Sequence, residues 1–197
     1  MKKLRLLLVL LISLACSVNA MAWDGSDDYS DARSVEHVFS FNFGPAWMTL
    51  REVDKATGRR FSDRMGYDYQ ASYTCCFMSE ETEGIGWGIG LLGAMNRTEY
   101  FRMVKNYYLA PQVELIMGGY PYSRFRFKCN LGIGVNSFDS QCEVGANFGG
   151  GLEYQLSKYF GLGLDLGFLA WKPSNPYENT DKSNSRFTVM IGAKFHL

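Results

Sequence analysis

The two histidines of the chain are the side chains best suited to acid–base chemistry at neutral pH. One is His37, which has Ser34 and Ser40 nearby in sequence, and the other is His196, the next-to-last residue. A serine nucleophile also needs an orienting acid and an oxyanion hole, and the sequence around His37 supplies neither. The glycine motifs of hydrolases and of phosphate-binding loops are absent as well. We therefore expect no catalytic centre.

Four cysteines lie beyond residue 22, and their spacing indicates neither a metal site nor a fixed disulfide framework. Cys75 and Cys76 are adjacent, Cys129 and Cys142 are far from them, and no CxxC or His–Cys spacing occurs. The acidic stretch 23–33 lacks the ligand spacing of a calcium-binding loop. We expect no metal and no cofactor. The cysteines are interpreted as small apolar residues, with a disulfide as the alternative.

Eight charged residues occupy the polar side of segments in which every second residue is apolar. The acids are Asp68, Glu114, Glu153 and Asp165, and the bases are Arg126, Lys128, Arg186 and Lys194. So few charges would be sparse for a surface in water. Their balance suits a packed interior in which opposite charges neutralise each other. We therefore predict structural ion pairs inside the fold.

The elements that carry these charges are predicted to be β-strands. Residues 160–168 alternate apolar side chains with glycine or aspartate, and such a period of two is typical of a strand. The same pattern predicts eight strands, at residues 35–49, 65–77, 85–95, 107–117, 124–135, 144–156, 160–171 and 186–197. Pro111 cannot donate a ladder hydrogen bond, and it predicts a bulge in the fourth strand.

The predicted connections alternate between long and short. The long ones are residues 51–64, 96–106, 136–143 and 172–185, and the short ones are 78–84, 118–123 and 157–159. Outer-membrane barrels have this asymmetry, with long loops outside the cell and tight turns in the periplasm. An even number of strands then places both chain ends at the short-turn end. His37 and His196 belong there too, and we interpret them as interfacial or lumen-filling side chains.

Aromatic residues cluster near both ends of the predicted strands, as they do at the two interfaces of a membrane. Near the long loops these are Trp47, Tyr67, Phe168, Trp171 and Phe187, and near the short turns Phe77, Phe125, Tyr154, Phe160 and Phe195. A barrel of about eight strands is narrow enough for its own side chains to fill. The sequence therefore predicts an all-β fold, an eight-stranded antiparallel transmembrane up-and-down β-barrel. A soluble periplasmic barrel is the structural rival.

Residues 1–22 have the pattern of a signal peptide. A basic start is followed by an apolar stretch, and Ala20-Met21-Ala22 fits a cleavage site after Ala22. Cleavage after Ala20 and lipidation at Cys16 are the alternatives. Residues 23–33 are predicted to be a flexible acidic tail, and residues 34–197 the barrel. Without the leader the chain has 17 basic and 20 acidic residues, which gives no reason to expect a nucleic-acid partner.

Three segments carry a resemblance to a known family. Residues 145–168 resemble the penultimate hairpin of small outer-membrane β-barrel proteins, the OmpA-like and OmpX-like "porin family" of Bacteroidetes and Proteobacteria. Residues 107–113 look like the fourth strand of that family, and 186–197 look like its terminal assembly signal. The family usually ends in phenylalanine, whereas this chain ends in Leu197 with Phe195 two residues before it. The resemblance implies an outer-membrane location and insertion by the barrel assembly machinery.

These features favour a structural, envelope-stabilising or surface-binding role with a side-chain-filled lumen. A small porin for ions or solutes is the first alternative, and a lipid-modifying enzyme, which the histidine positions disfavour, is the second. We expect a monomer among outer-membrane lipids. The loops carry an excess of basic residues, and we hypothesise that four of them contact lipopolysaccharide phosphates: Arg59, Arg60, Arg102 and Lys105.

Overall fold

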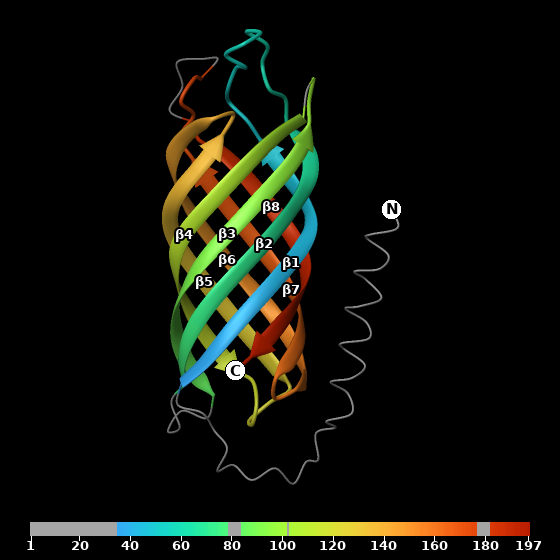
Figure 1. The fold of residues 1–197 in the computed structure, drawn as a ribbon, viewed down its shortest axis with the longest axis vertical. Coiled ribbons are helices and arrows are strands. Elements are labelled where there is room, and N and C mark those ends of the chain that lie inside the picture. Colours follow the sequence, from blue (N-terminus) through green and yellow to red (C-terminus); the bar gives the residue numbers. More distant parts are fainter. Residues whose placement is uncertain (1–34, 79–83, 102, 177–181) are drawn as a thin grey trace.

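The computed structural model describes residues 35–78, 84–101, 103–176 and 182–197. They form a closed barrel of eight strands, in which each strand pairs antiparallel with the next and β8 pairs with β1 (Figure 1). The strands are β1 (Val35–Thr49), β2 (Arg64–Met78), β3 (Ile85–Glu99), β4 (Met103–Gly118), β5 (Phe125–Phe138), β6 (Gln141–Ser157), β7 (Phe160–Trp171) and β8 (Asn184–His196). The predicted eight-stranded barrel is confirmed. The predicted signal peptide and acidic tail, and Arg102, lie outside the described residues.

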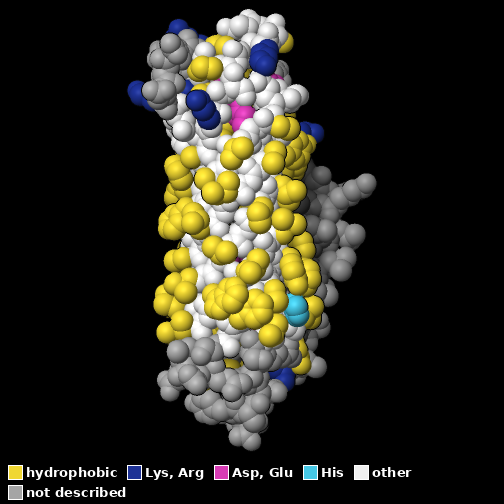
Figure 2. All heavy atoms as spheres, turned by 90° about the vertical axis from the view of Figure 1, so that its left-hand side faces the viewer, with side chains coloured by type: hydrophobic (Ala, Val, Ile, Leu, Met, Phe, Trp, Pro, Cys, Tyr) yellow, Lys and Arg dark blue, Asp and Glu magenta, His cyan; other side chains and the backbone are white. Residues whose placement is uncertain are grey.

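The period of two places small and polar side chains inside the barrel and apolar side chains outside it. Along β4, exposed and buried residues alternate from Met103 to Met117. The outer side chains are widely exposed, with Val144 at 72% and Ile191 at 68%. Figure 2 shows them as a hydrophobic band over the wall, with Lys and Arg side chains gathered above it. No helix in the described residues is long and apolar enough to cross a membrane.

Two of the long connections predicted for one end of the barrel are wrong. Residues 96–106 are mostly strand, because polar side chains there alternate with outer residues and continue the β3–β4 ladder. Residues 136–143 also extend a hairpin, whose tight turn holds Asp139 and Ser140 at φ angles of 48° and 64°. The strict alternation of long and short loops therefore does not hold.

The two ends of the barrel differ in their connections. The loop end carries the β1–β2 segment 50–63 and the β7–β8 segment 172–183, which are the long connections at that end. The terminal end carries Val35, where β1 begins, and His196, where β8 ends.

The bulge predicted at Pro111 is also wrong. Pro111 pairs with Leu91 of β3, and its strand resumes pairing with β5 at Gln112 in unchanged register. The missing N–H removes a hydrogen-bond donor but does not insert an extra residue into the strand. Among the described ladders, the register shift lies instead in β6–β7, between Gln155 and Ser157.

Two aromatic residues assigned to the outer belts are buried. Trp171, which is 2% exposed, faces the lumen, because the period of two in β7 puts residue 171 on the same side as Asp165. Phe160 is 4% exposed, and its ring packs against Phe195 with centroids 5.3 Å apart. The aromatic belt at the loop end therefore lacks Trp171. In the belt at the terminal end, Phe160 is packed against Phe195 and is not exposed on the outer wall.

Candidate functional site

The lumen is the candidate site, because it gathers all eight charged residues that the sequence singles out. Asp68, Glu114, Arg126, Glu153, Asp165, Arg186 and Lys194 are buried, and Lys128 is partly buried beside them. Sequence reasoning missed one further acid, Glu36, and assigned no charge to His196; both are buried in the same interior. The signal for Glu36 was present, because it occupies the lumen phase of β1.

At the terminal end, Glu36, Arg126, Glu153 and His196 form one connected group, here called the terminal cluster. His196 Nδ1 lies 2.8 Å from Glu36 Oε1, and His196 Nε2 lies 2.5 Å from Glu153 Oε1. Arg126 Nη2 donates a hydrogen bond to Glu36 Oε2 at 2.7 Å. Arg126 Nη1 also lies 3.1 Å from His196 Nδ1. The four side chains therefore form one continuous polar network at the terminal end.

Acids and bases lie close together in the lumen. The buried acids are Glu36, Asp68, Glu114, Glu153 and Asp165, and the bases are Arg126, Lys128, Arg186 and Lys194. Because an unpaired buried charge costs several kcal/mol, the proximity of opposite charges allows these groups to be accommodated inside a closed barrel.

The middle of the lumen is organised around Asp165. Lys128 Nζ lies 3.2 Å from its Oδ1, and Lys194 Nζ lies 3.0 Å from its Oδ2. Glycines make room for these groups: a Cβ at Gly163 would lie 2.5 Å from Lys194 Cε, and one at Gly151 would overlap the Asp165 carboxylate. The glycine side of β6 and β7 therefore provides space for the buried ions.

Further toward the loop end, Arg186 links the charges to a layer of amides. Its Nη1 lies 3.6 Å from Asp68 Oδ1 and donates to Asn106 Oδ1 at 2.5 Å. Asn106 Nδ2 in turn donates to Asn136 Oδ1 at 2.9 Å. These contacts hold in a fixed position an arginine that is only 2% exposed.

Glu114 is held by neutral donors, one of which, Gln112, lines a small cavity in the lumen. Thr74 Oγ1 donates a hydrogen bond to Glu114 Oε1 at 3.1 Å, and Gln112 Nε2 donates one to the same oxygen at 2.7 Å. Neutral side chains therefore supply the hydrogen bonds expected from a cation. A cavity of about 40 Å³ lies nearby, between Lys128 and Arg186. That volume is enough for roughly one or two water molecules.

The loop half of the lumen contains a hydrophobic cluster, here called the apolar plug. Its members are Met48, Leu50, Phe61, Leu92, Ala94, Tyr100, Val104, Tyr108, Ala110, Phe138, Leu169 and Trp171. Phe61 belongs to the 50–63 segment, which folds inward so that its ring packs edge-on against Tyr100 and Phe138 at 5.1 and 5.3 Å. Phe138 also packs against Trp171 at 6.0 Å. The mouth at the loop end is therefore closed by apolar side chains.

The two long segments of the loop end are joined over this plug. Val53 N donates to Asn175 O at 3.1 Å, and Asn184 Nδ2 donates to Glu52 Oε1 at 2.7 Å. Glu52 is 1% exposed. Burial raises the pKa of Glu52 to about 7, and the Glu143 carboxylate nearby acts in the same direction. The joined segments therefore contain a carboxyl group that titrates near neutral pH.

The histidines and serines do not form a nucleophilic site in the described part of the chain. His37 faces outward, with Nδ1 2.9 Å from the Tyr73 hydroxyl, whereas Ser40 faces the lumen and is buried. Ser34 lies outside the described residues. Both nitrogens of His196 are already engaged by carboxylates. Within the described ranges, no group of three or more His, Cys, Asp or Glu is arranged to hold a metal ion.

The cysteines and the basic residues proposed for lipopolysaccharide are dispersed. Cys75, Cys76, Cys129 and Cys142 are all free. Arg59 and Arg60 are exposed in the 50–63 segment, and the Arg59 guanidinium lies 5.8 Å from the Phe101 ring. Lys105 is exposed on the outer face of β4, opposite Arg97 of β3. The structure therefore places Lys105 on the barrel wall and not in a loop.

Comparison with known proteins identifies the fold alone. No protein-family model and no curated protein sequence matches the chain. Neisserial surface protein A superposes with a TM-score of 0.52 and 10% identity, over 83% of this chain and 99% of that chain. The chain has the fold of the small outer-membrane β-barrels. Ail, the attachment invasion locus protein of Yersinia pestis, gives 0.50 and 14% identity, over 84% of this chain and 100% of that chain.

Proposed function

We propose that this chain is an outer-membrane protein with a closed lumen, whose role is to stabilise the envelope or to bind ligands at the cell surface. The observation that carries the proposal is the double closure of the barrel, by the apolar plug at the loop end and by the terminal cluster at the other. The exposed apolar wall supports residence in a bilayer, because proteins in water rarely expose so much contiguous apolar surface.

The proposal extends to the surroundings of the protein. The predicted signal peptide supports export, and the resemblance to OmpA-like and OmpX-like barrels supports insertion by the barrel assembly machinery. The partners are then outer-membrane lipid and lipopolysaccharide, with the protein as a monomer. Arg59, Arg60, Arg102 and Lys105 are the proposed contacts to lipopolysaccharide phosphates, and no nucleic acid is involved.

Conductance in planar bilayers tests the closed lumen. We expect the wild-type barrel to produce no discrete current steps. The double variant Trp171→Ala/Glu153→Ala, which weakens both closures, should conduct, whereas each single variant should remain silent because the other closure persists. Heat-modifiable migration on a gel shows which variants are folded. Current steps from the wild type would favour the small-porin alternative and contradict the proposal.

Location and catalysis have separate tests. The protein should sediment with the outer-membrane fraction, and recovery in the soluble periplasmic fraction would contradict membrane residence. The proposal assigns the chain no catalytic role. Mass spectra of lipid A from cells with and without the protein should therefore be identical, and a loss or gain of acyl chains would favour the enzyme alternative.

A further inference from the structure

Small residues interrupt the bulky outer wall on one side of the barrel. One row of outward residues crosses five neighbouring strands from Ala193 through Phe41, Ala71 and Gly93 to Leu109. The row on its loop-end side is bulky and consists of Ile191, Phe43, Tyr69, Met95 and Tyr107. The row on its terminal-end side carries Phe195, Phe39, Tyr73 and Leu91 before it ends at Pro111. Within the first row, Phe41 and Leu109 are large and exposed, whereas Ala71 and Gly93 are small neighbours. The pair Ala71 and Gly93 therefore lies at the bottom of a trough.

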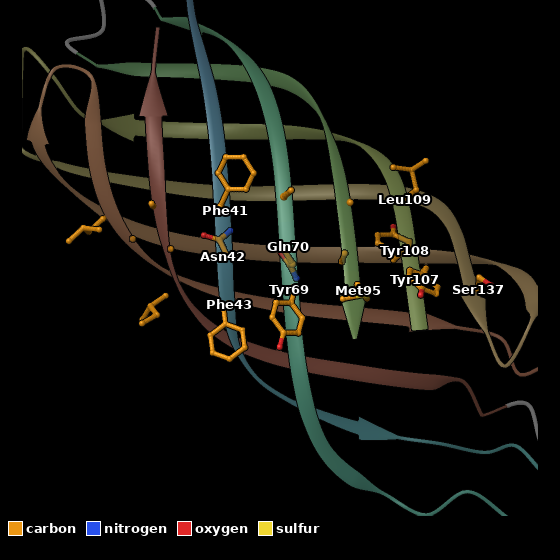
Figure 3. A pocket seen from close by; sticks show the side chains of 18 of the residues that line it. Phe41, Asn42, Phe43, Tyr69, Gln70, Met95, Tyr107, Tyr108, Leu109 and Ser137 are labelled. Carbon is orange, nitrogen blue, oxygen red and sulfur yellow. The ribbon is translucent and has the colours of Figure 1, made fainter. Parts of the chain in front are cut away.

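This trough, here called the wall groove, is large and apolar. Its volume is about 1410 Å³, and its outer lining includes Phe41, Ala71, Gly93 and Leu109. Figure 3 shows Phe41 and Leu109 in one row, with Phe43, Tyr69, Met95 and Tyr107 in the next. The strands cross the wall obliquely (Figure 1). A row of paired residues is roughly perpendicular to the strands, so the groove runs obliquely from β4 toward β8 and away from the loop end. A flexible hydrocarbon chain reaching down from the loop end fits this course.

Two basic residues lie on the outer wall at the loop-end side of the groove. Arg97 and Lys105 are cross-strand partners on the outer faces of β3 and β4, two residues nearer the loop end than Met95 and Tyr107. At about 3.3 Å per residue, Arg97 lies roughly 13 Å along β3 from Gly93. The basic pair is therefore nearer the loop end than the part of the groove over Gly93.

The placement of this pair needs an explanation, because like charges directly opposite each other destabilise a sheet. Among the described residues, neither Arg97 nor Lys105 takes part in an ion pair, and both are exposed. Arg97 Nε instead lies 3.3 Å from Met103 Sδ. An anion held between the two side chains would remove the repulsion, and phosphate suits both arginine and lysine.

We propose that this side of the barrel binds a phosphorylated, multiply acylated lipid of the outer leaflet, the chemistry of lipid A. Arg97 and Lys105 hold a phosphate, and an acyl chain lies in the wall groove over Gly93 and Ala71. The inference rests on the proposed function and on the predicted orientation, in which the loop end lies outside the cell and the basic pair lies at the outer leaflet. It adds to the proposed contacts of the basic residues one site that has a headgroup part and a chain part.

Native mass spectrometry of the full barrel in detergent, titrated with diphosphorylated lipid A, tests the headgroup part. Arg97→Gln/Lys105→Gln should weaken binding about tenfold, because it removes two charge-assisted contacts. The matched control is Lys55→Gln/Lys172→Gln, which removes two exposed charges elsewhere at the loop end. This control should bind within about twofold of the wild type. Equal effects of the two double variants would overturn the site.

Filling the groove tests the chain part. A Cβ at Gly93 would meet no atom closer than 3.8 Å, so Gly93→Leu should fold normally and occupy the groove. Gly150→Leu is the control, because Gly150 is on the outer phase of β6, where a Cβ would meet its first neighbour at 3.3 Å. Gly93→Leu should weaken lipid A binding several-fold, and Gly150→Leu should not. Unchanged binding by a heat-modifiable Gly93→Leu would overturn the chain part.

A second lipid identifies the source of the phosphate. Phosphatidylglycerol should bind more weakly than lipid A to the wild type, and equal or tighter binding would overturn the assignment to the outer leaflet. These failures differ from failure of the proposed function. A wild type that sediments with the membrane and does not conduct, but binds lipid A no better than the double variant, contradicts the lipid site alone.

Discussion

The two halves of the lumen are closed by opposite chemistry. At the loop end, aromatic and aliphatic side chains fill the barrel, and a long segment folds Phe61 into them. At the terminal end, charged side chains meet in the middle, as in the contacts of His196 with Glu36 and Glu153. The β6–β7 turn at the terminal end spans only from Ser157 to Phe160, and the charged groups of the terminal cluster reach inward from β1, β5, β6 and β8. A small apolar cluster of Val38, Cys76 and Ile116 lies in the same half.

The comparison shows that the two closures depend on different quantities. The apolar plug depends on volume, since its members only need to fill space. The ionic half depends on pairing, because each charge is favourable only while its partner is present. A single substitution should therefore have a larger effect in the ionic half, and charge should matter there more than size.

The largest effect is expected for Asp165→Asn. The substitution keeps the shape but leaves Lys128 and Lys194 buried together without their shared carboxylate. We expect the free energy of unfolding to fall by about 3–5 kcal/mol, measured by urea titration in lipid vesicles. Asp165→Asn/Lys128→Met should recover part of the loss. A loss below about 1 kcal/mol would mean that water solvates these charges and that the contrast between the halves is wrong.

Trp171→Ala should have the next largest effect, through volume alone. Trp171 is 2% exposed within the apolar plug, and its removal leaves a cavity. We expect a loss of about 3 kcal/mol, at the low end for such a change, because the 50–63 segment can settle into the space. Trp47→Ala is the control, because Trp47 is 44% exposed on the outer wall and should cost less. Equal losses would show that the plug is loosely packed.

The sequence predicts the wall of the barrel better than its contents. Alternation gives the strands and their lumen phase, and charge balance on that phase finds Asp165 and Arg126. Neither pattern predicts that Phe61 lies in the lumen, because a residue of a loop enters the lumen only through tertiary packing. The partners of His196 were missed because they are Glu36 and Glu153, which are 160 and 43 residues away in sequence.

The joined segments over the apolar plug should respond to pH through Glu52. Its pKa is raised from 4.5 to about 7, so the folded state binds a proton that the unfolded chain releases more readily. The stabilisation is fully present below about pH 4.5 and is lost as the pH rises through 7. We expect a loss on the order of 2 kcal/mol between pH 5 and 8, relative to Glu52→Gln.

The measurement for Glu52 is the difference between the urea-unfolding free energies of wild type and Glu52→Gln at each pH. Subtraction removes the titration of groups that do not interact with residue 52, whereas the interaction between Glu52 and Glu143 remains part of the difference. Hydrogen exchange at Val53, whose N–H binds Asn175 O, should report the same trend locally. A difference that stays constant with pH would show that the carboxyl group is solvated, and that the loop end responds to volume alone.

The smallest effect is expected for Arg97→Gln, and its sign is opposite to that of a change in the ionic half. A cation in the lumen is stabilised by its partners, as Lys194 is by Asp165, whereas Arg97 faces Lys105 on the outer wall. Its removal should raise the free energy of unfolding by about 0.2–0.5 kcal/mol in lipid-A-free vesicles at low salt, and the gain should vanish at high salt. If phosphate holds the pair, added lipid A should reverse the sign, because the wild type then gains a contact that the variant lacks. A gain that persists with lipid A present would mean that the pair binds no anion and is only a tolerated repulsion.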